Sequence, residues 1–521
     1  MNVNLRDPNI IMKLSRLGSF HQSKLSFLRS FLNEFKDWEY KRDLFDLDNK
    51  GFGTAVYSFK KKERVYSLVC FANEINENER SDRVIATKWD AAFTLHDGVP
   101  KREDIERLKN EVPKQEVGRL SYKELTLSRA NKSVRVFDHV VESLSKGHQP
   151  KLDLLEKVGY LYRTTAVYGS GKFGLADRFR IKNRDEINGP FRLEMMLVYL
   201  VRQFTFDQVN HVAKNKDPKN AVNLDPKICK NLGIGNSTGL GMAPFIVNHP
   251  TLLNNWIFCR ETALKKIREI KKVKSQEYNL FKDCVRNSIK NITSWNTESE
   301  YQLKKIKDLL KDLKKFINFI ENKFNFEIDY PFNDIYLWLE KETGEECIEY
   351  IVSIMMEPFD NIVDPLIKKM SSEEERYFDI PTHRTVNELR VIIEKKYSNI
   401  LSIDFDNKQN YKKFWFISKN KEEPRLADRF NENGADLEQP LAIARGIKKL
   451  YQKLLVSKNN LRIDQFLIEN SDLRHVVRRA FIIEKFPYSE IQDNTISENI
   501  VPIDMLRLKL SFFGALKFDP R

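Results

Sequence analysis

A polar stripe runs along an otherwise apolar stretch, PFRLEMMLVYLVRQFTFDQVNHVAKN, in which we expect a helix over 190–214. Five side chains of this stretch fall within about 100° of one another around a helix. They are Arg192, Gln203, Asp207, Asn210 and His211. Such a stripe either faces water or lines a polar cleft. In a cleft, the arginine and the amides would bind a carboxylate or phosphate, while Asp207 and His211, four residues apart, would share a hydrogen bond and transfer a proton.

A Gly-rich centre, GSGK, lies in the stretch YRTTAVYGSGKFGLADRFR (162–180). It is not a Walker A loop, because Ala166 replaces the first glycine, Phe173 replaces the Mg²⁺-binding hydroxyl, and we expect the preceding segment to be helical. The backbone N–H groups of such a loop could face an anion, or the glycines could merely end a helix. The candidate binding residues here are Arg163, Tyr168, Gly169, Ser170, Gly171, Lys172 and Arg178.

A second Gly-rich stretch is NLGIGNSTGLGMAPFIVNHP (231–250), and its presence favours a binding role for both Gly-rich stretches. Loops of small, uncharged residues are costly to order and often functional. The spacing of its glycines does not match the dinucleotide-binding GxGxxG pattern. The stretch leads into a helix expected from about Pro250, at whose start an anion could rest. The candidates are Asn236, Ser237, Thr238 and Asn248 for binding and His249 as a general acid.

These residues together predict a soluble enzyme that binds a small anionic substrate or cofactor. The cleft would be formed by the Gly-rich loops 169–174 and 233–241 and the polar stripe of the helix 190–214. The sequence indicates neither the reaction class nor the identity of a cofactor. The alternative is an RNA- or DNA-binding protein that uses a basic surface, and the third hypothesis is a helical interaction or scaffold protein.

The elements that must position these residues predict a mainly α protein, with a multi-helix central region and smaller α+β segments at the N- and C-terminal ends. We expect an α+β domain with an antiparallel meander over 1–118, a helical domain over 119–395 and a mixed α/β region over 396–521. Apolar residues at alternating spacings of three and four over 298–325 indicate a helix with one apolar seam. That seam suits an intermolecular coiled coil, and thus a homo-oligomer, but a hairpin against 276–292 is preferred.

Composition limits the classes of partner. The 521 residues carry 88 Lys and Arg against 74 Asp and Glu, and this net charge of +14 suits nucleic acid or simply reflects a lysine-rich composition. We find no apolar run of transmembrane length and expect no membrane partner. The five cysteines form no CxxC and the eight histidines no HExxH, so we expect no metal site and a reducing, cytoplasmic location. Residues 12–33 lack acids, as transit peptides do, but an ordinary packed helix is preferred.

Overall fold

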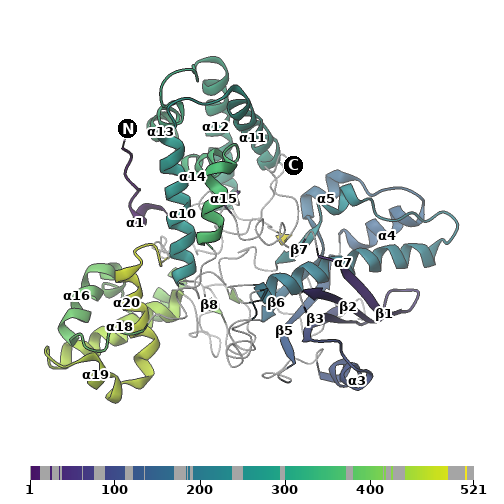
Figure 1. Cartoon of the computed structure of the whole chain (residues 1–521), viewed down its shortest axis with the longest axis horizontal. Coiled ribbons are helices and arrows are strands. Elements are labelled where there is room, and N and C mark those ends of the chain that lie inside the picture. The colour runs from purple at the N-terminus through teal and green to yellow at the C-terminus, as the bar shows by residue number, and fades with distance from the viewer. Residues whose placement is uncertain are drawn as a thin grey trace.

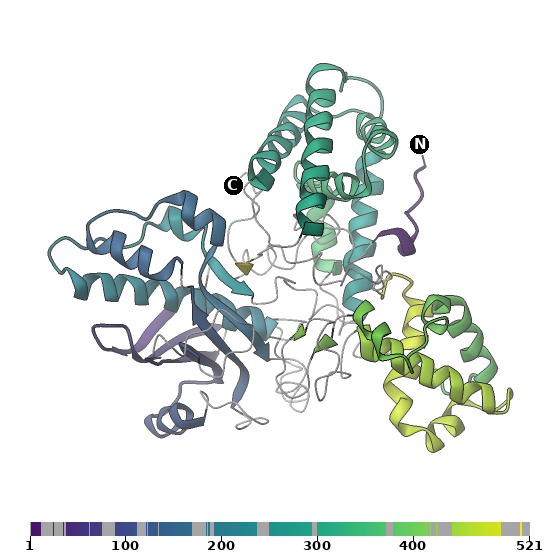
Figure 2. The same ribbon diagram turned by 180° about the vertical axis from the view of Figure 1, so that it is seen from behind.

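The computed structural model describes most of the chain. The described residues are 2–11, 24–25, 35, 38–61, 63–74, 89–111, 121, 123–133, 135–168, 184, 186–187, 192–236, 250–293, 300–370, 379–414, 416–417, 424–425, 440–490 and 511–512. They fall into a sheet region and two groups of helices, seen from opposite sides in Figures 1 and 2.

Eight strands of the described residues form one sheet, in the order β1-β2-β3-β4-β5-β6-β7-β10. Their bounds are β1 (Tyr40–Leu47), β2 (Gly53–Lys61), β3 (Arg64–Ala72), β4 (Ala91–Asp97), β5 (Glu124–Lys132), β6 (Tyr160–Tyr168), β7 (Gly233–Asn236) and β10 (Ser511–Phe512). Each strand from β1 to β6 is antiparallel to the next, whereas β6 and β7 are parallel. The sheet is therefore mixed, with one parallel pair, β6 and β7, among the described strands.

The expectation of a mainly α protein with α+β segments only at its two ends is wrong. Seven of the eight strands of the mixed sheet, β1 to β7, lie in the N-terminal part of the chain, and most of the helices follow them. The error arose between residues 119 and 168, where β5 and β6 replace the expected helices and, among the described residues, only α4 (Phe137–Ser145) and α5 (Leu152–Val158) are helical. The residues of β5 are buried on both faces of the sheet. Such strands lack the polar alternation that distinguishes a strand from a buried helix.

The two faces of the sheet are covered by different helices. The 25-residue helix α7 (Arg192–Lys216) occupies the apolar segment described above and packs on one face, with α4 beside it. On the opposite face, Ile105 and Leu108 of α3 (Arg102–Glu111) pack on Val56, Val69 and Leu127. The sheet is thus the middle layer over much of its area.

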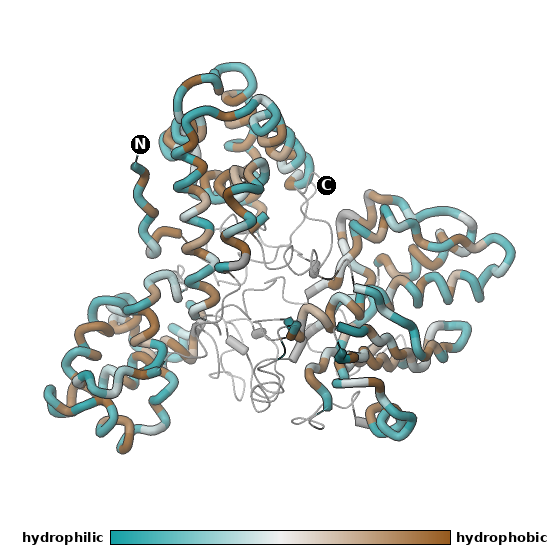
Figure 3. Tube along the Cα trace, in the orientation of Figure 1, coloured by the Kyte–Doolittle hydropathy of each residue, from teal (hydrophilic) through white to brown (hydrophobic). Residues whose placement is uncertain are grey.

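The first helical group follows α8 (Pro226–Cys229) and β7. It comprises α10 (Pro250–Arg268), α11 (Ser275–Thr293), α12 (Glu300–Asn322), α13 (Pro331–Glu342), α14 (Glu345–Met355) and α15 (Asp360–Met370). Hydrophilic and hydrophobic residues alternate along these helices (Figure 3). The apolar seam of α12 packs within the chain, on α11 and α14, and the Tyr278 hydroxyl donates to the Ile320 carbonyl at 2.7 Å. The short helix α1 (Pro8–Ile11) also lies beside this group (Figure 1).

The C-terminal helical group has a hydrophobic core of its own. It comprises α16 (Val386–Lys396), α17 (Ser398–Leu401), α18 (Pro440–Val456), α19 (Ile463–Glu469) and α20 (Arg474–Lys485), with 3₁₀ turns at Lys408–Lys413 and Ser471–Leu473. Two short strands, β8 (Phe416–Ile417) and β9 (Pro424–Arg425), form a separate pair. The division of the chain into independently folding domains at 118 and 395 stays a prediction.

Candidate anion-binding site

The segment from β6 to β7 is a strand–helix–strand unit. Strands β6 and β7 are parallel neighbours, with Tyr160 opposite Gly233 and Thr164 opposite Asn236, and the connection between them contains α7. Parallel neighbouring strands require such a crossover. The carboxyl ends of β6 and β7 therefore point to the same edge of the sheet, which we call the carboxyl edge.

The start of α7 lies at the carboxyl edge because the residues before it are fixed there. Arg184 forms two hydrogen bonds with the Asp97 carboxylate, of 2.8 and 2.9 Å, at the end of β4. Glu186 accepts hydrogen bonds from the Tyr66 hydroxyl, at 2.6 Å, and from Arg64, at 3.3 Å, at the start of β3. Burial raises the pKa of Glu186, but these hydrogen bonds lower it to a net value below its ordinary one.

The other end of α7 lies at the opposite edge of the sheet. The buried Gln208 donates a 2.8 Å hydrogen bond to the Gly51 carbonyl in the turn between β1 and β2. The His211 Nε2 lies 2.8 Å from the Asp48 carbonyl oxygen of the same turn. At a rise of 1.5 Å per residue, Asp207 and His211 lie about 23 and 28 Å along the helix from Arg192.

The polar stripe of α7 is divided among several structural contacts. Gln203 accepts a 3.3 Å hydrogen bond from the Tyr40 hydroxyl, and Asp207 accepts one of 2.8 Å from Tyr57. Asn210 accepts a 2.8 Å hydrogen bond from the Leu224 backbone N–H. Asp207 and His211 thus have different partners and do not form the expected pair. The structure separates Arg192, at the carboxyl edge, from the other members of the stripe.

Arg163 lies on β6, within the parallel pair. Its Cα is opposite Asn131 on β5 and Gly235 on β7. Asn131 and Arg129, two residues apart on β5, share the face directed away from α7, and the Arg129 guanidinium lies 4.8 Å from the Trp89 ring centroid. Two arginines and an amide therefore share one face of β5 and β6.

Many of the candidate residues lie outside the described residues: Gly169, Ser170, Gly171, Lys172, Arg178, Ser237, Thr238, Asn248 and His249. Tyr168 and Asn236 are described by their backbone alone, as the last residues of β6 and β7. The segment 169–174 nevertheless follows the last residue of β6, and the segment 233–241 begins with β7 itself. The residues that follow the two strands therefore start from one edge.

One of the three arguments against a phosphate loop is removed. The segment before GSGK is the strand β6, not a helix. The other two differences from the Walker A pattern, Ala166 and Phe173, are properties of the sequence and remain.

Arg202 supports β7 and was not among the predicted site residues. Its guanidinium is buried and donates to the Leu232 carbonyl at 2.7 Å and to the Cys229 carbonyl at 2.5 Å. Burial lowers the pKa of Arg202. An arginine in a long apolar helical run was the signal that could have identified it, since buried charges require partners.

A second buried polar cluster lies where β4, β5 and α3 meet. The Glu124 carboxylate accepts a 2.8 Å hydrogen bond from Arg107, and His96 Nδ1 lies 3.4 Å from Glu124 Oε1. Burial alone would raise the pKa of Glu124. Hydrogen bonds from His96, Arg107 and Ser121 have the larger effect and lower the pKa to about 2. These residues cannot be grouped from the sequence, because they come from three separate segments.

Comparison with known proteins finds no match to a family model, to a curated protein or to a solved structure. Among the described residues, no His, Cys, Asp and Glu side chains gather in a group of three or more that could hold a metal ion. No helix within these residues is both long and apolar enough to cross a membrane.

Proposed function

We propose that the protein is an enzyme that binds a small anionic substrate or cofactor at the carboxyl edge of β6, α7 and β7. The observation that carries this proposal is the parallel pairing of β6 with β7 around α7. Ligands of open α/β sheets bind outside the carboxyl ends of parallel strands. Here β6 and β7 run in the same direction, and their carboxyl ends lie at one edge of the sheet.

Electrostatics supports an anionic ligand. The N-terminus of a helix carries partial positive charge and unsatisfied N–H groups, and α7 begins at this edge. Arg192 is the first residue of α7, at this edge. Arg163 stands on β6 beside β7, on the sheet face directed away from α7, and enters the proposal only as a more distant positive charge. The Gly-rich residues that follow β6 and those that follow β7 would supply further N–H donors at this edge.

Asp207 and His211 do not enter this proposal as acid or base. Their partners are Tyr57 and the Asp48 carbonyl, at the other end of α7. His249 stays the proposed general acid, because it belongs to the segment that continues from β7. We also propose a cytoplasmic location, which suits five cysteines without a disulfide.

A thermal-shift screen against anionic metabolites, nucleotides and short RNA tests the proposal. A small anion should raise the melting temperature of the wild type, and Arg192→Ala should abolish the shift. Arg135→Ala is the matched control, since Arg135 is exposed at the start of α4 and the variant loses the same charge. An equal loss of the shift in both variants contradicts the proposal. A shift by RNA alone that salt abolishes replaces it with the nucleic-acid alternative.

A further inference from the structure

Residues 2–11, which we call the N-terminal strap, lie along the first helical group far from the sheet (Figure 1). Val3 and Ile11 are buried, and the Val3 backbone N–H donates a 2.9 Å hydrogen bond to the Glu269 carboxylate. The strap contains little regular structure, only the four residues of α1. Side chains therefore fix it in place.

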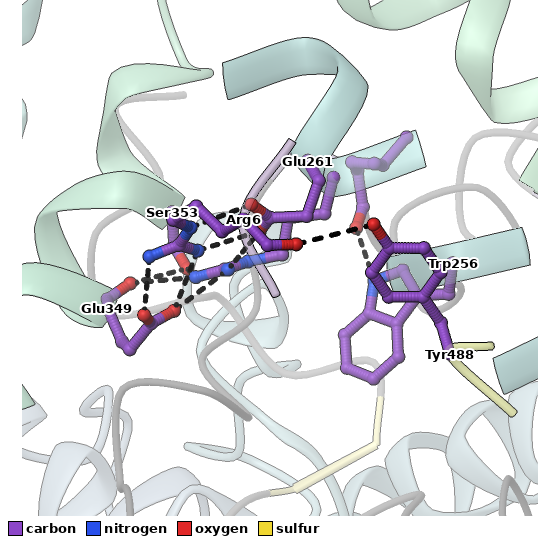
Figure 4. Close-up of polar contacts among 8 residues, drawn as sticks. Arg6, Trp256, Glu261, Glu349, Ser353 and Tyr488 are labelled. Atoms are coloured by element: carbon purple, nitrogen blue, oxygen red, sulfur yellow. Dashed lines mark hydrogen bonds and ion pairs between the residues drawn. The ribbon is translucent and has the colours of Figure 1, made fainter. Parts of the chain in front are cut away.

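Arg6 of the strap inserts between two buried carboxylates (Figure 4). Its Nε and Nη2 donate 2.7 Å hydrogen bonds to the two oxygens of Glu261 on α10. Its Nη1 donates to Glu349 on α14 at 2.7 Å. The Glu261 and Glu349 side chains are 1% and 2% exposed, whereas that of Arg6 is 14% exposed. The planar, two-sided fit requires the fork of a guanidinium, which an ammonium lacks.

Arg260 shares these carboxylates but cannot neutralise both. Its Nη1 lies 3.3 Å from Glu261 and 2.9 Å from Glu349, and its Nη2 donates to the Glu349 carbonyl at 3.0 Å. Arg6 is the guanidinium that pairs closely with both carboxylates. Its loss removes a close counter-charge from two buried negative groups, which is unfavourable.

The strap also contacts the segment that leaves the C-terminal helical group. Tyr488, three residues after α20, donates from its hydroxyl to the Arg6 carbonyl at 3.4 Å. Its backbone N–H donates to Asn254 of α10 at 3.1 Å, and its ring lies edge-on to Phe258, with centroids 6.3 Å apart. Tyr488 is buried in the larger core, not in that of the C-terminal helices. The strap thus lies at the joint between the two helical groups.

We propose that Glu261 and Glu349 form a guanidinium-binding site whose ligand is Arg6 of the same chain, and that its occupation holds the joint between the two helical groups. The ligand class is a planar guanidinium side chain. An ammonium would satisfy one carboxylate as a point charge and leave the other poorly paired.

Chemical rescue of full-length Arg6→Ala tests the proposal. We expect a lower melting temperature and, by small-angle scattering, a larger radius of gyration than in the wild type. Millimolar guanidinium chloride should then restore both quantities, and the same concentration of sodium chloride should not. Guanidinium can reach the vacated site because the Arg6 side chain is partly exposed. Arg286→Ala is the control, since Arg286 also pairs with two carboxylates, Asp283 and Glu321, but at the surface.

Arg6→Lys keeps the positive charge and is the second variant, which tests the proposal if Arg6→Ala does not fold. We expect it to be less stable than the wild type and to gain stability from added guanidinium only weakly, because the lysine occupies the site. Equal melting temperatures for Arg6→Lys and the wild type would overturn the requirement for a guanidinium. Failure of guanidinium to restore a folded Arg6→Ala, or equal effects of Arg6→Ala and Arg286→Ala, would overturn the site itself.

Discussion

The hydroxyl of Tyr57, on β2, donates a 2.8 Å hydrogen bond to the carboxylate of Asp207, on α7. Tyr57 is fully buried, and Arg42 lies 3.5 Å from the same carboxylate. Burial, followed by the nearby Asp207 charge, raises the pKa of Tyr57, so its hydroxyl remains a donor. This contact fastens the helix to the sheet and gives Asp207 a structural role.

Tyr57→Phe should therefore lower the free energy of unfolding by about 1–3 kcal/mol, as expected for a hydrogen bond to a charged group. Urea denaturation measures the change. A double-mutant cycle with Asp207→Asn should show coupling between the two positions. Tyr40→Phe is the control, since Tyr40 is exposed and its bond to Gln203 is 3.3 Å long. Equal effects of the two Tyr→Phe changes contradict this role of Tyr57.

Arg202→Met should destabilise the protein by about 2–4 kcal/mol, because two buried carbonyl groups lose a charged donor. The carbonyls belong to Cys229 and Leu232, just before β7. In Arg202→Met, the backbone amides of Gly233–Asn236 should lose more of their protection from hydrogen exchange than those of β3. Arg135→Met removes the same charge from an exposed position and should change little. Unaltered protection of β7 in Arg202→Met would show that the arginine does not support that strand.

Gly235→Ala should destabilise β7, because a Cβ there would lie 2.5–2.7 Å from ring atoms of Tyr160. We expect a loss of about 1–3 kcal/mol in chemical denaturation, as for other overpacked sites. Adding Tyr160→Leu should recover part of the loss by removing the ring. Gly344→Ala is the comparison, since its Cβ would come no closer than 3.3 Å, to Asp312. If the second substitution recovers nothing, the ring contact is not the cause.

Glu124 should make the free energy of unfolding depend on pH in the acid range. Its pKa is about 2 in the folded protein, below its ordinary value of 4.5, so its ionised form stabilises the fold at neutral pH. This contribution is lost as the pH falls from about 4.5 towards 2. The free energy of unfolding of Glu124→Gln should therefore fall less than that of the wild type across this range. Parallel curves for the two proteins would rule out Glu124 as a source of the acid dependence.

The cysteines should react slowly with a thiol reagent in the native protein. Cys70, Cys259, Cys284 and Cys347 are buried, and Cys229 is half-buried. Burial raises the pKa of Cys229 to about 11, so little of the reactive thiolate is present at neutral pH. A colorimetric thiol assay should detect all five thiols only after denaturation, with Cys229 the first to react in the native state. Fast labelling of any other cysteine contradicts the buried positions.

The strands of the meander and the helix α7 could be predicted from the sequence, because their apolar periodicities are local properties. β5 and β6 could not, because strands buried on both faces resemble buried helical segments. β7 is only four residues long and Gly-rich, so its own residues have little strand propensity, and its pairing with β6 stabilises the extended backbone. The strand propensity of a segment does not show which other strand pairs with it.

The candidate site could be predicted only in part, because its local patterns are visible in the sequence and its contacts between distant segments are not. The two Gly-rich segments could be found from composition, but their common edge depends on the parallel register of Tyr160 with Gly233. The stripe on α7 was correct as helical geometry, yet its residues contact elements distant in the sequence, such as Tyr57 and Asp48. Helical spacing shows which side chains share a face and does not show what lies against that face.

The docking of Arg6 has a consequence for the order in which the chain acquires its structure. Arg6 bonds to residues that follow it by 255 and 343 positions. Closing a loop of this size costs conformational entropy, and contacts between distant segments form late in folding. During synthesis Arg6 leaves the ribosome long before Glu261 and Glu349 exist. The strap must therefore remain undocked until both helices have emerged, so one of the first segments to be made reaches its final place only after 343 further residues.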